Sequence, residues 1–152
     1  MQVKYSDLKN KRVFITGGGS GIGASIVEHF CEQGSEVYFV DINLKETKKL
    51  LNKIKKNKFR APIFIKCNLL DINKLEKIIR NIITQRGPIH ALINNAANDD
   101  RHTTDEVDEK YWENRIAINL KHYFFAAKAV VKSMKKIKSG SIVNLSSVSW
   151  ML

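Results

Sequence analysis

Three glycines, Gly17, Gly21 and Gly23, stand at the junction between a short apolar segment and a helical pattern. Glycine lets a backbone turn tightly and approach a bound group closely, and the helix that follows offers free N–H donors and a partial positive charge. Such a turn suits a pyrophosphate. The spacing Gly-x-x-x-Gly-x-Gly differs from the commoner Gly-x-Gly-x-x-Gly and lacks the Gly-Lys-Ser/Thr ending of an ATPase loop. The pattern predicts a dinucleotide-binding turn, against the alternative of a glycine-rich turn without a ligand.

Asp41 ends the next apolar segment, about 20 residues beyond the glycines, where a carboxylate accepts hydrogen bonds from adenosine ribose hydroxyls. Because this carboxylate would repel a 2′-phosphate, we expect the cofactor to be NAD rather than NADP. Lys45 is near enough to weaken that preference. The alternative role for Asp41 is the N-cap of the next helix, and one side chain can hold both roles.

Short apolar segments alternate with helical patterns along the chain. Ile22, Ile26 and Phe30, for example, recur at four-residue steps, as on the buried face of a helix. The predicted strands are 12–16, 37–40, 63–65, 89–93 and 141–145, and the predicted helices are 21–33, 44–56, 71–86 and 108–136. This order indicates an α/β fold with a Rossmann-type, doubly wound parallel sheet in a single domain over residues 1–152.

The chain has a net charge of +11 and a pI near 9.7, which raises the question of nucleic-acid binding. Its lysines fall on presumed outer faces of helices and are not interleaved with exposed aromatic residues. We therefore expect a solvated, lysine-rich surface and no nucleic-acid partner. The lysines concerned are Lys45, Lys48, Lys49, Lys53, Lys55, Lys56, Lys58, Lys132, Lys135, Lys136 and Lys138.

The two cysteines, Cys31 and Cys67, lie far apart and in no metal-ligand spacing, so we expect two buried thiols and no metal. No apolar run approaches the ~18 residues that a membrane span requires. The N-terminus lacks the apolar core of a signal peptide. These features predict a cytoplasmic protein without a membrane partner.

The segment from Thr16 to Gly23, together with Asn94-Asn95-Ala96-Ala97, Asn119 and Ser146-Ser147, resembles the short-chain dehydrogenase/reductase family. The resemblance implies a Rossmann-type sheet and a nicotinamide cofactor. By the family pattern, Asn68 and Leu69 lie beside the adenine, and Asn95 and Ala96 lie near the ribose on the nicotinamide side. Asn68 replaces a frequent Asp, and its amide can still donate and accept hydrogen bonds. The implied cofactor-binding residues are Gly17, Ser20, Gly21, Ile22, Gly23, Asp41, Asn68, Leu69, Asn95 and Ala96.

The family's active site is a tetrad of Asn, Ser, Tyr and Lys. Asn119 matches the first member and would hold a water for the lysine, although it can also be a tolerated polar residue within a helix. Ser147 matches the second and would hydrogen-bond the reacting oxygen of the substrate; Ser146 is less suited by register. The Tyr-x-x-x-Lys pair would fall beyond Leu152. We therefore expect the N-terminal part of a subunit, with about five of the family's seven strands, that is inactive alone.

A finer resemblance rests on Asn98–His102 and on residues 111–127, which look like the aldose 1-dehydrogenase branch. It implies hydride transfer from C1 of a cyclic sugar to NAD, giving a lactone. His102 would then contact substrate or be an ordinary exposed loop residue. His29, His90 and His122 are interpreted as structural or superficial. The alternative function is a non-catalytic fragment that binds a dinucleotide or a partner subunit.

The resemblance also implies a homo-oligomer in the full-length form. Strand 141–145 would be an open sheet edge, and the helix before it would expose an apolar patch. We therefore expect the isolated chain to be poorly soluble, molten or oligomeric. The apolar residues of that helix are Phe124, Phe125, Ala126, Ala129 and Val130.

Overall fold

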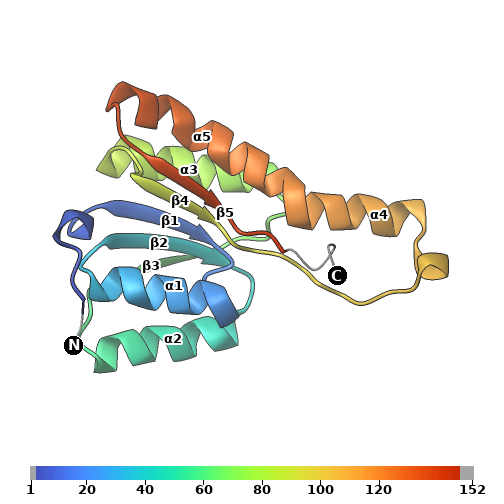
Figure 1. The fold of residues 1–152 in the computed structure, drawn as a ribbon, viewed down its shortest axis with the longest axis horizontal. Helices are drawn as coiled ribbons and strands as arrows, with labels where there is room; N and C mark the ends of the chain where they lie inside the picture. Colours follow the sequence, from blue (N-terminus) through green and yellow to red (C-terminus); the bar gives the residue numbers. More distant parts are fainter. Residues whose placement is uncertain (1–2, 148–152) are drawn as a thin grey trace.

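A computed structural model describes residues 3–147, and the sheet within that range has five parallel strands in the order β3-β2-β1-β4-β5 (Figure 1). This arrangement confirms the predicted α/β, doubly wound fold. The chain runs outward from β1 to β3, then returns to β4 on the other side of β1. The strands are β1 (Arg12–Thr16), β2 (Glu36–Asp41), β3 (Ile63–Lys66), β4 (Ala91–Asn94) and β5 (Ser141–Asn144).

Helices cover both faces of the sheet (Figure 1). One layer holds α1 (Gly21–Glu32) and α2 (Leu44–Lys56), and the other holds α3 (Ile72–Arg86) with α5 (His122–Lys136). Successive residues of β1 point to opposite faces of the sheet. Val13 packs in the core under α1, whereas Phe14 packs in the core under α3 and α5. Burial on both faces explains why the strands read as continuous apolar runs.

The predicted long helix over 108–136 is interrupted. An α-helix, α4 (Glu109–Ile116), is followed by a π-helical segment, η3 (Ala117–Lys121), and then by α5. A π-helical turn widens the backbone by one residue per turn and is often found at functional sites. Asn119 lies inside this segment. Two short 3-10 turns complete the elements, η1 (Ser6–Leu8) and η2 (Thr104–Glu106).

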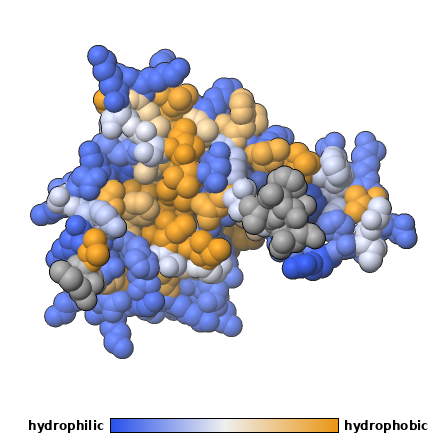
Figure 2. All heavy atoms as spheres, in the orientation of Figure 1, coloured by the Kyte–Doolittle hydropathy of each residue, from blue (hydrophilic) through white to orange (hydrophobic). Residues whose placement is uncertain are grey.

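The edge strand β5 is exposed along its whole length, as predicted. Figure 2 shows hydrophobic atoms over the centre of the face on which β5 lies. The predicted patch on the preceding helix is partly wrong, because Ala126 and Val130 are fully buried against the sheet. Phe124, also predicted, is exposed, and the other exposed large apolar residues near it in the chain include Ile116, Leu120 and Val131, with Ile142 and Val143 on β5.

The lysines predicted to face solvent are all exposed. They lie on α2 and α5 or within two residues of the end of these helices. Asp71 caps α3, because its side chain accepts the backbone N–H of Lys74. No helix within residues 3–147 is long and apolar enough to cross a membrane.

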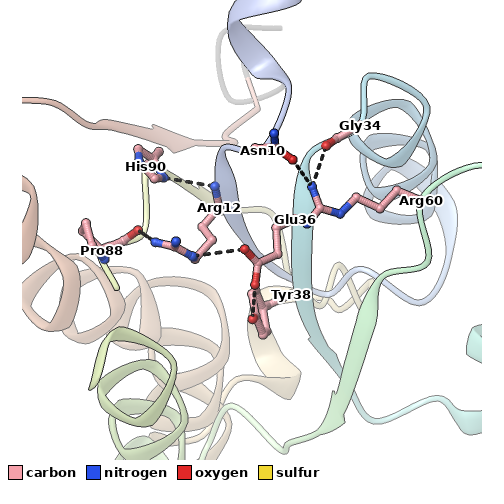
Figure 3. Close-up of polar contacts among 8 residues, drawn as sticks. All are labelled: Asn10, Arg12, Gly34, Glu36, Tyr38, Arg60, Pro88 and His90. Carbon is pink, nitrogen blue, oxygen red and sulfur yellow. Dashed lines mark hydrogen bonds and ion pairs between the residues drawn. The ribbon is translucent and has the colours of Figure 1, made fainter. Parts of the chain in front are cut away.

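A polar network closes the edge of the sheet where the strands begin (Figure 3). The guanidinium of Arg12 donates to Glu36 at 3.1 Å and to the Pro88 carbonyl at 2.8 Å. The backbone N–H of Arg12 donates to Nδ1 of His90, which is therefore unprotonated at that nitrogen. Tyr38 donates to the same Glu36, and burial together with this carboxylate raises the pKa of Tyr38 to about 12. The network links β1, β2 and the start of β4.

We predict that Arg12→Met lowers the free energy of unfolding by about 1.5–3 kcal/mol, because Glu36 and the Pro88 carbonyl lose a charged donor in a partly buried place. Chemical denaturation measures the change. Lys49→Met is the control: it removes an exposed pair with Glu46 and should change stability by less than about 1 kcal/mol. Equal effects of the two substitutions would contradict the structural role given to Arg12.

Candidate functional site

A cavity of about 610 Å³ opens at the carboxyl ends of the strands, beside the point where strand order reverses. Ligands of open α/β sheets bind in such a crevice. Nine of the ten residues predicted to bind the cofactor line it, and Gly21 is the exception. The nine are Gly17, Ser20, Ile22, Gly23, Asp41, Asn68, Leu69, Asn95 and Ala96.

The glycine turn packs so tightly that side chains are excluded. A Cβ on Gly23 would overlap the Gly17 carbonyl oxygen, and one on Gly17 would lie 2.8 Å from Cα of Ala96. Gly17 also adopts a positive φ of 66°, which favours glycine. Gly21 shares a positive φ of 53°, but open space surrounds it. Of the three glycines of the predicted motif, Gly17 and Gly23 are therefore needed for room and Gly21 for its backbone angle alone.

Asp41 ends β2 and turns its carboxylate back toward the glycine turn. Oδ2 accepts the backbone N–H of Gly19 at 2.8 Å, and Oδ1 accepts that of Asn43 at 2.8 Å. The N-cap of α2 is Asn43, whose side chain accepts the N–H of Glu46, so the alternative role for Asp41 as that cap is wrong. Asp41 is held in place at the cavity wall by two backbone groups.

Asn95 ties the end of β4 to the glycine turn. Its side-chain amide donates to the carbonyls of Thr16 and Gly17 at 3.1 and 3.0 Å. In return, Oγ1 of Thr16 accepts the backbone N–H groups of Asn95 and Ala96. The wall near β4 and the turn after β1 are therefore one hydrogen-bonded unit.

Asn68 and Leu69 follow β3 at the opposite end of the cavity. The exposed Asn68 uses Oδ1 to accept the backbone N–H of Leu70 at 3.1 Å, while Leu69 is buried. The amide nitrogen of Asn68 has no recorded partner among the described residues. Cys67, beside them, is buried, and burial raises the pKa of its thiol, so it is kept protonated.

Asn119 clamps the loop that follows β4. Its Oδ1 accepts the backbone N–H of Asn98 at 2.7 Å, and its Nδ2 donates to the Asn98 carbonyl at 3.1 Å. Both ends of the amide are thus engaged, 21 positions away in sequence. Ser147 follows β5, is exposed, and does not line the cavity.

An ordered group of side chains ties the loop after β4 to α4. Tyr111 and His102 share a hydrogen bond of 2.7 Å, and the Arg115 guanidinium stacks over the Tyr111 ring at 4.8 Å. Arg115 also pairs with Asp100 at 3.1 Å, and Asp100 lines the cavity. His102 is therefore an anchored loop residue rather than a loose one.

The cofactor-binding residues predicted from the sequence did not include several residues that line the cavity, namely Ile42, Asn43, Cys67, Ala97, Asn98, Asp99, Asp100 and Ile118. Most directly follow a strand, and that position is the signal that could have found them. Ile118 comes from η3, which the sequence did not reveal. Both cysteines are free and buried as predicted. Within residues 3–147, no group of three His, Cys, Asp or Glu residues is placed to hold a metal.

A family model described as short chain dehydrogenase matches residues 11–151. D-xylose 1-dehydrogenase of Caulobacter vibrioides is 40% identical over 148 residues, covering 97% of this chain and 58% of that protein. Probable galactose dehydrogenase GalD of Rhizobium meliloti is 38% identical over 149 residues, with 98% and 58% covered.

Two solved structures are also similar. Thermoplasma acidophilum aldohexose dehydrogenase, in ligand-free form, matches with a TM-score of 0.79 and 30% identity, covering 95% of this chain and 52% of that one. A metagenomic short-chain oxidoreductase in complex with NADP matches with a TM-score of 0.86 and 23% identity, covering 95% and 65%. The second likeness shows the fold alone.

The chain belongs to the short-chain dehydrogenase family of oxidoreductases, which bind a nicotinamide dinucleotide, and its relatives include sugar dehydrogenases. It spans about 58% of the length of the D-xylose and galactose dehydrogenases that it matches.

Gly23→Ala should destabilise the fold much more than Gly21→Ala. The new methyl group at Gly23 would overlap the Gly17 carbonyl and press on the Asn95 amide, whereas at Gly21 it enters open space and adds about 1 kcal/mol of backbone strain. Thermal unfolding of the two variants beside the unsubstituted protein measures the difference. Equal melting temperatures for the two variants would contradict the claim that a Cβ has no room at Gly23.

Acid should weaken the fold in part through His122, which is fully buried and whose pKa is lowered by that burial to about 4. Because the unfolded chain takes up this proton near pH 6.5 and the folded chain only near pH 4, stability falls as pH drops through this window. His122→Phe should flatten the fall, as read from denaturation midpoints at several pH values. An equally steep fall in His122→Phe would contradict this contribution.

Proposed function

We propose that the cavity binds a nicotinamide dinucleotide, with its pyrophosphate against the glycine turn and the N-terminus of α1. The observation that carries the proposal is the convergence of Gly17, Gly23, Asp41 and Asn95 on one cavity at the switch point of the sheet. The first N–H groups of a helix have no intrahelical partner and attract an anion. Asn68 and Leu69 would flank the adenine, and Asn95 and Ala96 the nicotinamide ribose.

The same geometry favours NAD over NADP. The carboxylate of Asp41 is held by Gly19 and Asn43 through single hydrogen bonds to each oxygen, so further lone pairs are available for the ribose hydroxyls. A 2′-phosphate placed there would face a fixed negative charge. Lys45, on the exposed side of α2, is the nearby cation that would reduce this repulsion.

We further propose that the full-length protein oxidises a sugar at C1, in line with the activities named for its relatives. The nicotinamide, when bound, would accept the hydride. Asn98, Asp99 and Asp100 surround the cavity mouth with polar groups suited to a polyhydroxyl substrate. Asn119 would act by holding the loop through Asn98, and Ser147 would hydrogen-bond the reacting oxygen.

A second function is favoured by one observation: no tyrosine and no lysine lines the cavity among the described residues. The residues that do line the cavity would then bind the cofactor, or a partner subunit, without catalysing hydride transfer. We propose cofactor or subunit binding without hydride transfer as the alternative to sugar oxidation.

The cofactor proposal predicts that the chain binds NADH at least about tenfold more tightly than NADPH, a difference of about 1.4 kcal/mol. Fluorescence titration of the two reduced cofactors measures it. Asp41→Asn should bring the two affinities close together, because it removes the charge while its amide oxygen can still accept one of the two backbone N–H groups. Asp7→Asn, on the exposed η1 turn, is the control. Tighter NADPH binding by the unsubstituted chain would contradict the assignment of NAD, and no binding of either would contradict the proposed function.

A further inference from the structure

A buried imidazole lies beside the last residue of β1, just before the glycine turn that lines the cavity. His122 begins α5, directly after the π-helical segment η3, and its side chain is fully buried. Nε2 lies 3.5 Å from Oγ1 of Thr16, the last residue of β1. The proposed reaction makes no use of this histidine.

The hydrogen bonds of Thr16 define which form His122 takes. A threonine hydroxyl has one proton to donate and two lone pairs to accept with. The backbone N–H groups of Asn95 and Ala96 donate to Oγ1 at 3.1 and 3.2 Å and fill both lone pairs. The hydroxyl proton is then left to donate, and Nε2 of His122, 3.5 Å away, is the atom placed to accept it.

An imidazole that accepts at Nε2 is neutral and carries its proton on Nδ1, a buried atom that makes no well-formed hydrogen bond within residues 3–147. Burial opposes the charged form of the ring and lowers its pKa, in agreement with the neutral state, whereas the backbone of Ile118 in η3 has the smaller, opposite effect on the pKa. Among the described residues, no charged side chain shifts the pKa of the ring, and the Tyr123 ring packs edge-on with its centroid 4.6 Å away.

We propose that His122 is a positioning residue that orients the Thr16 hydroxyl and, through it, holds Asn95 and Ala96 in the wall of the cofactor cavity. Asn95 in turn donates to the carbonyls of Thr16 and Gly17, so the effect extends to the glycine turn. The effect on cofactor affinity rests on the proposed function, whereas the effect on the cavity wall does not.

The test is a double-mutant cycle of Thr16→Val and His122→Phe, read by amide hydrogen exchange at Asn95 and Ala96 and by NADH titration. His122→Phe should speed exchange of these two amides at least about tenfold relative to the Ile93 amide, and should weaken NADH binding. In the Thr16→Val background, the same substitution should change neither measurement further. His122→Gln, which can place an acceptor near the Nε2 position, should restore much of the protection.

Unchanged exchange at Asn95 and Ala96 in His122→Phe, with lower global stability, would reduce His122 to core packing and overturn the proposal. A large effect of His122→Phe in the Thr16→Val background would overturn it as well. If His122→Phe does not fold, nitrogen NMR of the unsubstituted protein decides: a protonated Nε2 contradicts the proposal and an unprotonated Nε2 supports it. If the unsubstituted chain binds no cofactor, the proposed function fails, while the exchange data still decide the role of His122.

Discussion

The close approach of the turn after β1 to the end of β4 is the constraint on which the rest of the site depends. Gly17 and Gly23 leave no room for a Cβ against Ala96, the Gly17 carbonyl and the Asn95 amide. Because that contact is so short, the turn, the start of α1 and the wall formed by β4 hold fixed positions. A site for a long, flexible dinucleotide gains affinity from such preorganisation, since little chain entropy remains to be lost on binding.

The order of the strands places this contact beside the crevice in which the cavity opens. β1 is flanked by β2 and β4, so the chain diverges in both directions at its carboxyl end and leaves a crevice there. Asp41 ends β2 on one side of the crevice, and the Asn98 loop follows β4 on the other. The π-helical turn at Asn119 aims an amide at that loop and engages both its donor and its acceptor. The proposed dinucleotide would thus meet Asp41 at one end of the cavity and the Asn98 loop at the other.

The fold and most of the cavity could be predicted from the sequence because their causes are local. Apolar runs bounded by turn residues predicted the strands, and the spacing of Gly17, Gly21 and Gly23 predicted the turn. The π-helical segment could not be predicted, since inserting one residue per turn leaves an apolar pattern that still reads as one helix. The partners of Asn119 and His122 lie 21 and 106 positions away, and no local pattern reports such pairings. Which face of the helix is buried was also misjudged at Ala126 and Val130, which pack on the sheet.

The most direct test of this account is an amide chemical-shift map of the chain titrated with NADH. The account predicts shifts concentrated in the glycine turn, at Asp41–Asn43 and from Asn95 to Asp100, because these segments form one cavity wall. Saturating NADH that left these amides unmoved, or that shifted only residues on the lysine-rich outer surface of α5, would contradict it.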